Sequence, residues 1–402
     1  MKIVIAPNAF KGTILSEDVA VAIATGIRRV LPEADIVEVP VSDGGDGSLS
    51  TFLDLFDGFS RSSTVCGPLG EPVEAEWGII NDGKTAFIET ALAFGLALVP
   101  MDKRNPSITT SRGVGDLIVS ALDLGLRDFI IAVGGSANND GGTGVLRALG
   151  AKFLDKNGRE LNDGGGALKR LVHIDLDNLD PRIKESTILV LSDSSVPLTG
   201  DIGVSIMYSP GKGASKEMAQ DLDKALRHYA EVIRRQYDVD VEKMPCAGSG
   251  GGVVCAVEVF LNAHRSFGID VVLEKIKFDR LLTGADLVIT GEGMVDAQTI
   301  YNKAPIGVAQ VAAKANIPVL FICAKLGEGY EKVYDHGVDA IMAIAEDKGW
   351  CHTKATVTES LLRLSTEDVF RQLRTNRDFL LRQSSRFYNS IKKWDNRNGC
   401  NA

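Results

Sequence analysis

A glycine run with an acidic residue close by follows a predicted strand three times along this sequence, and that order limits the possible folds. Glycine runs around residues 44, 135 and 292 each follow a stretch typical of a buried strand, and each contains Asp or Glu. Glycine is abundant, with 42 among 402 residues, and such runs mark tight turns or backbone that approaches a ligand. Open α/β sheets bind ligands outside the carboxyl ends of their strands. The order therefore indicates an α/β fold with a polar site at those ends.

Both ends of the chain alternate strands and helices, whereas the middle has a different pattern. Strands at 2–6 and 35–41 surround a helix that we expect Ser16 to cap, and another helix begins near Ser48. Turn sequences within residues 63–100 predict antiparallel strands there. Further strands are expected at 128–133, 187–191, 286–290, 318–323 and 339–344, and helices through Ala148, at 305–314 and from about 356 to 394 with Ser365 as a second start.

Similar α/β ends around a dissimilar middle indicate one domain inserted into another. We expect a discontinuous domain from residues 1–63 and 286–395, an inserted domain from residues 64–285, and a tail at 396–402.

Composition excludes several classes of protein. Lys and Arg number 44 against 53 Asp and Glu, a net charge of −9, and no long basic run is present, so a nucleic-acid partner is disfavoured. No apolar run is long enough to span a membrane, and the one at residues 3–6 is too short for a signal peptide. The six cysteines form no C-x-x-C pair, which favours reduced core thiols in a cytoplasmic protein.

The common nucleotide motifs are absent. Residues 209–215 approach a phosphate-binding loop of the G-x-x-x-x-G-K-[ST] type, but Lys212 is not followed by Ser or Thr. The first strand leads into residues 7–12, which contain no G-x-G-x-x-G, so NAD binding is disfavoured.

Charged residues nevertheless follow the predicted strands. Lys11 lies after the first strand, where an anion can bind, although it also fits an ordinary exposed lysine. Asp43 and Asp46 stand on a glycine turn and suit Mg²⁺, which takes one or two carboxylates plus water. An acidic turn without a ligand is the alternative.

The loop at 134–144 follows a strand and precedes a helix. Its glycines free backbone N–H groups to point at phosphates, and the helix adds its positive end. Asp140 is placed to face a metal or a hydroxyl. A flexible strand–helix connection is the alternative reading.

A second polar stretch begins at Gly291-Glu292-Gly293 and continues to Lys303. Asp296 suits a base or a metal ligand, and Lys303 suits a phosphate partner, unless the stretch is only a polar loop. Asp193 has the same placement after the strand at 187–191, and Arg112 is a weaker candidate for binding a carboxylate. Lysines, carboxylates and glycine loops without a covalent nucleophile indicate phosphoryl transfer, with a carboxylate taking the proton of the attacking hydroxyl.

The order of these motifs, from Met1 to about Ile344, resembles that of the bacterial glycerate kinases of the first type. The stretches that carry the resemblance are 6–12, 42–47, 134–142 and 287–293, with Asp296, Gln298, Thr299, Lys303 and 305–309. It implies a kinase that phosphorylates D-glycerate with ATP and Mg²⁺, usually giving 2-phosphoglycerate. It also implies two α/β domains, a flavodoxin-like or Rossmann-like parallel-sheet domain and an inserted mixed-sheet domain, with the active site in the cleft between them.

On this hypothesis each candidate residue has a role. The catalytic residues are Lys11, Asp193, Asp296 and Lys303, the substrate-binding residues are Asn8, Arg112 and Ser136, the nucleotide-binding residues are Gly134, Gly135, Asn138, Gly141, Gly142, Gly291, Glu292 and Gly293, and the Mg²⁺ ligands are Asp43, Asp46 and Asp140. Asp193 and Asp296 both remain candidates for the base, with Asp296 favoured.

Three positions depart from the family pattern. Val196, Gly211 and Asn302 stand where the family usually has asparagine, glutamine and glycine. Two alternatives stay open for this reason, a kinase of another small hydroxy acid and a weakly active nucleotide- or metabolite-binding regulator. The sequence does not indicate an oligomeric state.

Overall fold

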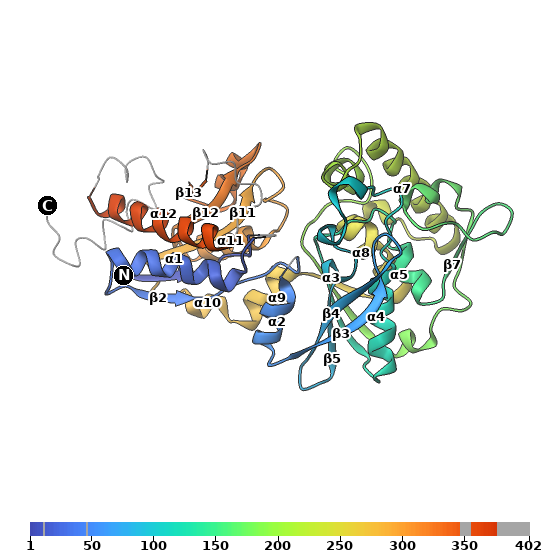
Figure 1. Ribbon diagram of the computed structural model, residues 1–402, viewed down its shortest axis with the longest axis horizontal. Helices are drawn as coiled ribbons and strands as arrows, with labels where there is room; N and C mark the ends of the chain where they lie inside the picture. Colours follow the sequence, from blue (N-terminus) through green and yellow to red (C-terminus); the bar gives the residue numbers. More distant parts are fainter. Residues whose placement is uncertain (11–12, 46, 346–354, 376–402) are drawn as a thin grey trace. The chain divides into compact units, whose positions relative to one another are not determined.

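The computed structural model describes residues 1–10, 13–45, 47–345 and 355–375, which form two compact units (Figure 1). The first unit comprises Met1–Asp43 and the chain from Ile269 onward, and the second comprises Gly44–Gly268. Each has its own sheet with helices, so the α/β class and the insertion of one unit into the other are confirmed.

The first unit contains a five-stranded sheet in the order β13-β12-β11-β1-β2, with every neighbouring pair parallel. Numbered along this unit alone, the order is 2-1-3-4-5, which is that of the flavodoxin-like fold. The flavodoxin-like prediction is therefore confirmed. The strands are β1 (Lys2–Ile5), β2 (Asp35–Glu38), β11 (Leu287–Val295), β12 (Val319–Leu326) and β13 (Ala340–Ala343).

Two helices pack together on one face of this sheet. They are α1 (Ser16–Val30) and α12 (Ala355–Thr375), which Figure 1 shows side by side. A β-carbon on Gly26 would lie 2.5 Å from the backbone oxygen of Arg363, so glycine permits the close helix contact. The helix α11 (Ala304–Lys314) packs against β11 and β12. The core shared by α1, α12 and the strands includes Ile3, Ile5, Ile23, Ile27, Leu287, Ile289, Leu320, Ile322, Leu362 and Phe370.

The second unit contains a six-stranded mixed sheet in the order β10-β9-β6-β5-β4-β3. The pairs β3–β4 and β4–β5 are antiparallel, as the turns within residues 63–100 predict, and the remaining pairs are parallel. The strands are β3 (Phe59–Cys66), β4 (Pro72–Ile80), β5 (Thr85–Glu89), β6 (Asp128–Val133), β9 (Thr187–Ser192) and β10 (His264–Phe267), and a separate hairpin pairs β7 (Lys152–Leu154) with β8 (His173–Asp175).

The strands of the mixed sheet and the helices of the second unit other than Ser48–Leu55 contribute residues to one apolar core. The helices are α2 (Ser48–Leu55), α3 (Ala91–Phe94), α4 (Arg112–Asp123), α5 (Thr143–Ala148), α6 (Val204–Tyr208), α7 (Lys216–Tyr237) and α8 (Ser249–Leu261), with 3-10 turns at Leu96–Leu98, Met101–Lys103, Gly165–Arg170, Pro181–Glu185, Pro210–Lys212 and Val241–Lys243. The chain then continues through α9 (Gly268–Lys275) and α10 (Phe278–Leu281) to β11, and a last 3-10 turn, Tyr330–His336, precedes β13.

The units divide earlier in the chain than the expected joins at 63/64 and 285/286. The chain passes from one unit to the other at Asp43/Gly44 and at Gly268/Ile269. Helix α2 belongs to the second unit because it packs against β4 and β5, with the rings of Phe52 and Phe87 stacked 4.3 Å apart.

Three details of secondary structure were predicted wrongly. Ser16 does not cap α1, since Leu15 occupies the N-cap position and the Ser16 hydroxyl bonds the carboxylate of Glu17. Strand β11 does not end at residue 290 but continues to Val295 because it stays paired with β12. Helix α12 passes through residue 365 without a new start, and the part of that predicted helix beyond residue 375 lies outside the described residues.

Candidate functional site

The first candidate site lies at the carboxyl end of the flavodoxin-like sheet. The strand order reverses between β1 and β11, and such switch points are where open α/β sheets bind ligands. Asn8 follows β1 directly, and its backbone N–H donates to the carbonyl of Gly291 in β11 at 2.9 Å. The chain segments after these two strands are therefore joined at the switch point.

Asp43 is buried at this point, with 1% of its surface exposed. Its Oδ2 accepts a hydrogen bond from the side-chain amide of Asn8 at 3.1 Å and another from the backbone N–H of Ala304 at 3.3 Å. Ala304 is the first residue of α11. Asp43 thus lies at a helix N-terminus, where the helix dipole stabilises a negative charge.

Glu292 links two residues of the loop after β11. Its Oε1 accepts a hydrogen bond from the Thr299 hydroxyl at 2.7 Å, and its Oε2 lies 3.4 Å from the Nζ of Lys303. Glu292 is 5% exposed, whereas the Lys303 side chain is 18% exposed. Lys303 is therefore a partly buried cation at the N-cap of α11, held by a carboxylate from the neighbouring strand.

Asp296 begins the same loop and is half-buried. Its Oδ1 accepts a hydrogen bond from the backbone N–H of Gln298 at 2.8 Å, which forms a tight local turn. Its other carboxylate oxygen accepts no hydrogen bond from any residue in the described ranges. Asp296 is thus held by one oxygen and retains the other for a ligand or a proton.

Residues 291–293 are part of strand β11 rather than a loop after it, which corrects the expected end of this strand at residue 290. Gly291 pairs with Ile322 in β12. A β-carbon on Gly291 would lie 1.9 Å from the carbonyl oxygen of Ile322. Close strand packing therefore accounts for this glycine without a nucleotide.

The second candidate site lies at the carboxyl ends of β6 and β9 in the mixed sheet. Gly134 follows β6 and Asp193 follows β9. A β-carbon on Gly134 would lie 2.5 Å from the Cα of Gly45 and 2.9 Å from Oδ2 of Asp193. The glycine runs around residues 44 and 135 therefore lie together at this edge, beside Asp193 at the end of β9.

Glu89 is a buried acid that the sequence analysis missed. It ends β5, is 3% exposed, and accepts hydrogen bonds from the backbone N–H groups of Gly47 and Leu49 at 2.9 and 2.8 Å. Its carboxylate therefore caps the N-terminus of α2 and fixes the end of the acidic glycine turn. A charged residue that ends a strand directly after three apolar residues was the available signal.

Asp140 is fully buried, and its hydrogen bonds occupy both carboxylate oxygens. Oδ2 accepts from the N–H and the hydroxyl of Ser111 and from the N–H of Gly144, while Oδ1 accepts from the Asn138 amide and the N–H of Gly142. An ionised carboxylate has about four lone-pair sites. The hydrogen bonds from these donors occupy all the lone-pair sites of the Asp140 carboxylate, so the geometry leaves no site for a metal. The carboxylate is a negative charge at the start of α5.

The glycine run at 250–252 supports this loop from the other side. All three residues have positive φ, and regular helix in α8 begins only after them. The carbonyl of Gly251 accepts from the N–H of Gly141 at 2.8 Å, and the carbonyl of Gly250 accepts from the Asn138 amide at 3.0 Å. The backbone N–H groups of Gly141 and Gly142 thus donate hydrogen bonds within the protein. The start of the loop, at residues 135–136, is half-buried.

Lys212 is a second residue for which the sequence predicted no role, because it was considered only within the failed match to a phosphate-binding loop. It lies in the turn Pro210–Lys212 and is 6% exposed. Its Nζ donates to the Ser136 hydroxyl at 2.9 Å and to the Asn138 carbonyl at 2.7 Å. Burial lowers the pKa of Lys212 to about 8, an effect that the negative charges of Asp193 and Asp140 partly oppose. A lysine between two glycines in an otherwise ordinary turn was the available signal.

The remaining predicted residues divide into two groups. Arg112 begins α4, next to the residue that binds Asp140, and its guanidinium forms no ion pair with the residues that the structure describes. Lys11 and Asp46 lie outside the described residues. In the described part of the chain, no three His, Cys, Asp or Glu side chains form a metal-binding group.

The three departures from the family pattern fit their surroundings. Asn302 has φ of 60°, a left-handed conformation that asparagine tolerates better than most residues in place of glycine. Gly211 faces open space, and Val196 is 5% exposed within the core of the second unit. None of these residues disturbs the local backbone.

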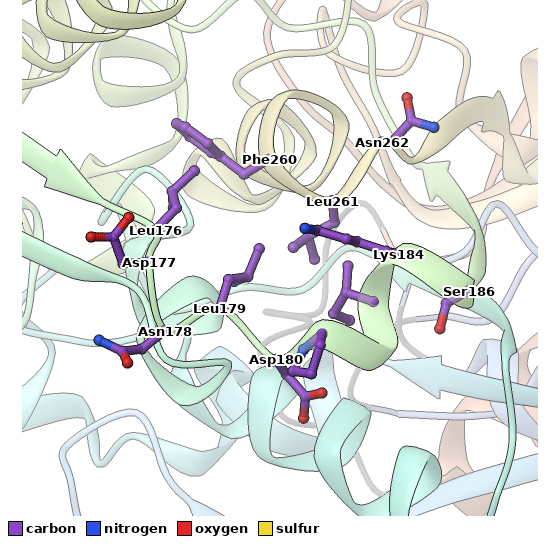
Figure 2. A pocket seen from close by; sticks show the side chains of 12 residues that line it. Leu176, Asp177, Asn178, Leu179, Asp180, Lys184, Ser186, Phe260, Leu261 and Asn262 are labelled. Carbon is purple, nitrogen blue, oxygen red and sulfur yellow. The ribbon is translucent and has the colours of Figure 1, made fainter.

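A hollow of about 860 Å³ lies elsewhere in the second unit (Figure 2). Ser186 precedes β9 and Asn262 precedes β10, so the hollow is at the amino ends of these strands, opposite the edge that carries Asp193. No residue of the predicted site lines it.

Three cysteines are buried as the core thiols expected from the sequence. They are Cys246, Cys255 and Cys323. Burial raises the pKa of the Cys255 thiol to about 12, which keeps it protonated and inert. None of the helices in the described ranges combines the length and apolar character of a membrane span.

Comparisons with known proteins identify a single family. The model of the Glycerate kinase family matches residues 3–374. The Glycerate 2-kinase of Escherichia coli (strain K12) is 48% identical over 349 residues, covering 87% of this chain and 92% of that protein. The Glycerate kinase of Bacillus subtilis (strain 168) is 44% identical over 344 residues, covering 86% and 90%. A crystal structure from Salmonella typhimurium LT2, assigned to glycerate kinase 2, shares 39% identity and a TM-score of 0.72, covering 94% of this chain and 99% of that one.

Proposed function

This chain belongs to the glycerate kinase family, and from that premise we propose that it transfers the γ-phosphoryl group of ATP to the 2-hydroxyl of D-glycerate, giving 2-phosphoglycerate and ADP. The observation that carries this proposal is the pairing of Glu292 with Lys303, beside Asp296, at the switch point of the flavodoxin-like sheet. Phosphoryl transfer requires positioned cations and one carboxylate, and this loop provides both.

Asp296 is our candidate for the base. One of its oxygens is fixed by the Gln298 N–H, and the other accepts no hydrogen bond within the described ranges. The glycerate hydroxyl oxygen bonds to the γ-phosphorus, the bond from that phosphorus to the β–γ bridging oxygen breaks, and the hydroxyl proton passes to Asp296. Asp193 is the less favoured base because its charge acts on buried Lys212.

Lys303 and Asp43 have complementary roles in this proposal. Lys303 binds phosphoryl oxygens, and its ion pair with Glu292 keeps it oriented. Asp43 and Asp46 would hold Mg²⁺, directly or through water, and the ion would supply neutralisation of phosphate charge when bound. A single buried carboxylate with an amide neighbour fits Mg²⁺, which needs few protein ligands. Asn8 orients Asp43.

The second unit contributes anion binding in this proposal. Gly134, Gly135 and Ser136 contact phosphate or substrate oxygens, and Arg112 binds the substrate carboxylate. Asp140, which we expected as an Mg²⁺ ligand, instead positions the loop through its saturated hydrogen bonds, and with it Asn138, Gly141 and Gly142. We also propose a cytoplasmic location, which the thiols of Cys66, Cys246 and Cys255 support because they form no disulfide.

An assay of ADP release with a panel of hydroxy acids tests the function. We expect D-glycerate to be the preferred acceptor and ATP the preferred donor, and ³¹P NMR of the product identifies the phosphorylated hydroxyl. A different preferred hydroxy acid would change the acceptor and keep the kinase. Binding of ATP and D-glycerate without product would favour the regulator.

A further inference from the structure

The Lys212 ammonium is a buried charge without a counter-ion in contact. Among the residues that the structure describes, none of the carboxylates lies within ion-pair distance of its Nζ. Its two hydrogen-bond acceptors, the Ser136 hydroxyl and the Asn138 carbonyl, are neutral. Burying an unpaired cation is costly, so such a group requires an explanation.

The nearest negative charges do not neutralise it. The charges of Asp193 and Asp140 act on Lys212 through space, but neither carboxylate accepts a hydrogen bond from its Nζ. The Asp140 carboxylate is occupied by donors from Ser111, Asn138, Gly142 and Gly144. An ammonium group has three donors and Lys212 uses two, so one remains.

Further donors lie beside this third position. Ser136 is half-buried, and its hydroxyl is already in contact with Lys212. The backbone N–H groups of Gly135 and Ser136 make no hydrogen bond with any residue in the described ranges. Gly135 has φ of 60°, and left-handed residues of this kind occur in the turns whose successive N–H groups form anion-binding concavities.

We propose that Lys212, with the 135–136 backbone, forms an oxyanion subsite that binds a phosphoryl or carboxylate group of one of the two reactants. The cation, the hydroxyl and the two N–H groups match an anion with two or three oxygens. The identity of the reactant rests on the proposed function, whereas the presence of an anion subsite does not.

A purely structural role for Lys212 is the competing explanation. Lys212 joins Ser136 to Asn138 across the loop, and such a link would stabilise the loop without any ligand. The two roles differ in what a neutral substitute does. Lys212→Gln keeps N–H donors for the loop but removes the charge, so it separates anion binding from support of the loop.

Calorimetric titration of the full chain tests the subsite. ATP, D-glycerate and inorganic pyrophosphate are each titrated separately into wild type, Lys212→Gln and a matched control, Lys224→Gln, whose lysine side chain is 74% exposed. We expect Lys212→Gln to raise the dissociation constant of ATP or of D-glycerate about 10- to 100-fold. This is the loss of affinity typical of a missing charged hydrogen bond. The control is expected to match the wild type.

The ligand that is affected identifies the oxyanion. A loss confined to ATP and pyrophosphate assigns a phosphoryl group, and a loss confined to D-glycerate assigns a carboxylate. If the wild type binds pyrophosphate but neither ATP nor D-glycerate, the proposed function fails, and the pyrophosphate comparison alone decides the subsite. Affinities within twofold of wild type for every bound ligand, in a folded Lys212→Gln, overturn the proposal. Lys212→Met is the second uncharged variant if Lys212→Gln does not fold.

Discussion

Lys303 and Glu292 form an ion pair of 3.4 Å at the carboxyl end of the flavodoxin-like sheet. Lys303 stands before the first turn of α11, and Glu292 lies in β11. Glu292 also accepts a hydrogen bond from Thr299, so the carboxylate joins the strand to the loop and to the helix start. This connection fixes the direction in which the Lys303 ammonium points.

Substitution of Lys303 should affect turnover more than stability. The side chain is partly exposed, so Lys303→Met loses one weak ion pair, whereas a transition state loses a cation that is worth about 10²–10³ in kcat. Steady-state kinetics and thermal unfolding measure the two effects. Lys325→Met, on an exposed lysine of β12, is the control. A variant with normal kcat would remove Lys303 from the reaction.

Asp296→Asn should leave the loop folded and nearly abolish turnover. Asparagine retains an oxygen that accepts from the Gln298 N–H, but it cannot take a proton. Loss of a general base typically lowers kcat by about 10²–10⁴. Pre-steady-state and steady-state rates measure this, with Asp335→Asn as an exposed control. Near-normal turnover would exclude Asp296 as the base and return attention to Asp193.

Asp140→Ala should unfold the protein at much lower denaturant concentration. The substitution leaves donors of Ser111, Asn138, Gly142 and Gly144 buried without their acceptor, at a cost of about 3–5 kcal/mol. Urea unfolding measures the loss, and exposed Asp221→Ala is the control. If Asp140→Ala were as stable as wild type and its activity no longer depended on Mg²⁺, Asp140 would instead be a metal ligand.

The sequence predicted the edge of each sheet at which the candidate residues lie. Asn8, Asp43, Glu292 and Asp193 each follow or end a run typical of a strand, and parallel strands bring their carboxyl ends to one edge. The flavodoxin-like class followed from the resemblance rather than from the residue pattern, and the order of the strands was not predicted.

Residues whose role depends on long-range packing were not predictable. Lys212 is 76 positions from Ser136 and 74 from Asn138, and only the folded loop makes it a buried cation. Glu89 likewise reaches the start of α2, 42 positions from Gly47 and 40 from Leu49. Glycines at 291 and 293 suggested a loop because glycine weakens strands, but pairing with β12 overrides that local preference.

Gly291→Ala should destabilise the first unit strongly. The new β-carbon would lie 1.9 Å from the Ile322 carbonyl oxygen, so β11 and β12 must separate, at a cost of about 3 kcal/mol or more. Gly211→Ala is the matched control because nothing lies within 4 Å of its added carbon. Chemical denaturation compares the two variants. A stable Gly291→Ala with weakened ATP binding would instead support direct nucleotide contact at this glycine.

The charge of Lys212 should make stability rise with pH in a defined interval. Its pKa is about 8 in the folded protein against 10.5 ordinarily, because burial disfavours the charged form. Between these values the unfolded chain binds the extra proton, so the free energy of unfolding rises with pH, by roughly 3 kcal/mol in all. Below pH 8 both states are protonated and the cost of burial remains in full.

Comparison with Lys212→Gln isolates this effect. Buried Cys255 and Tyr229 have raised pKa values and act in the opposite direction, since the folded state keeps protons that the unfolded chain loses. Both variants contain these groups, so the difference in urea unfolding free energy between wild type and Lys212→Gln reports Lys212 alone. We expect that difference to shift in favour of wild type from pH 8 to 10.5, and a difference independent of pH would show that Lys212 is not a buried cation.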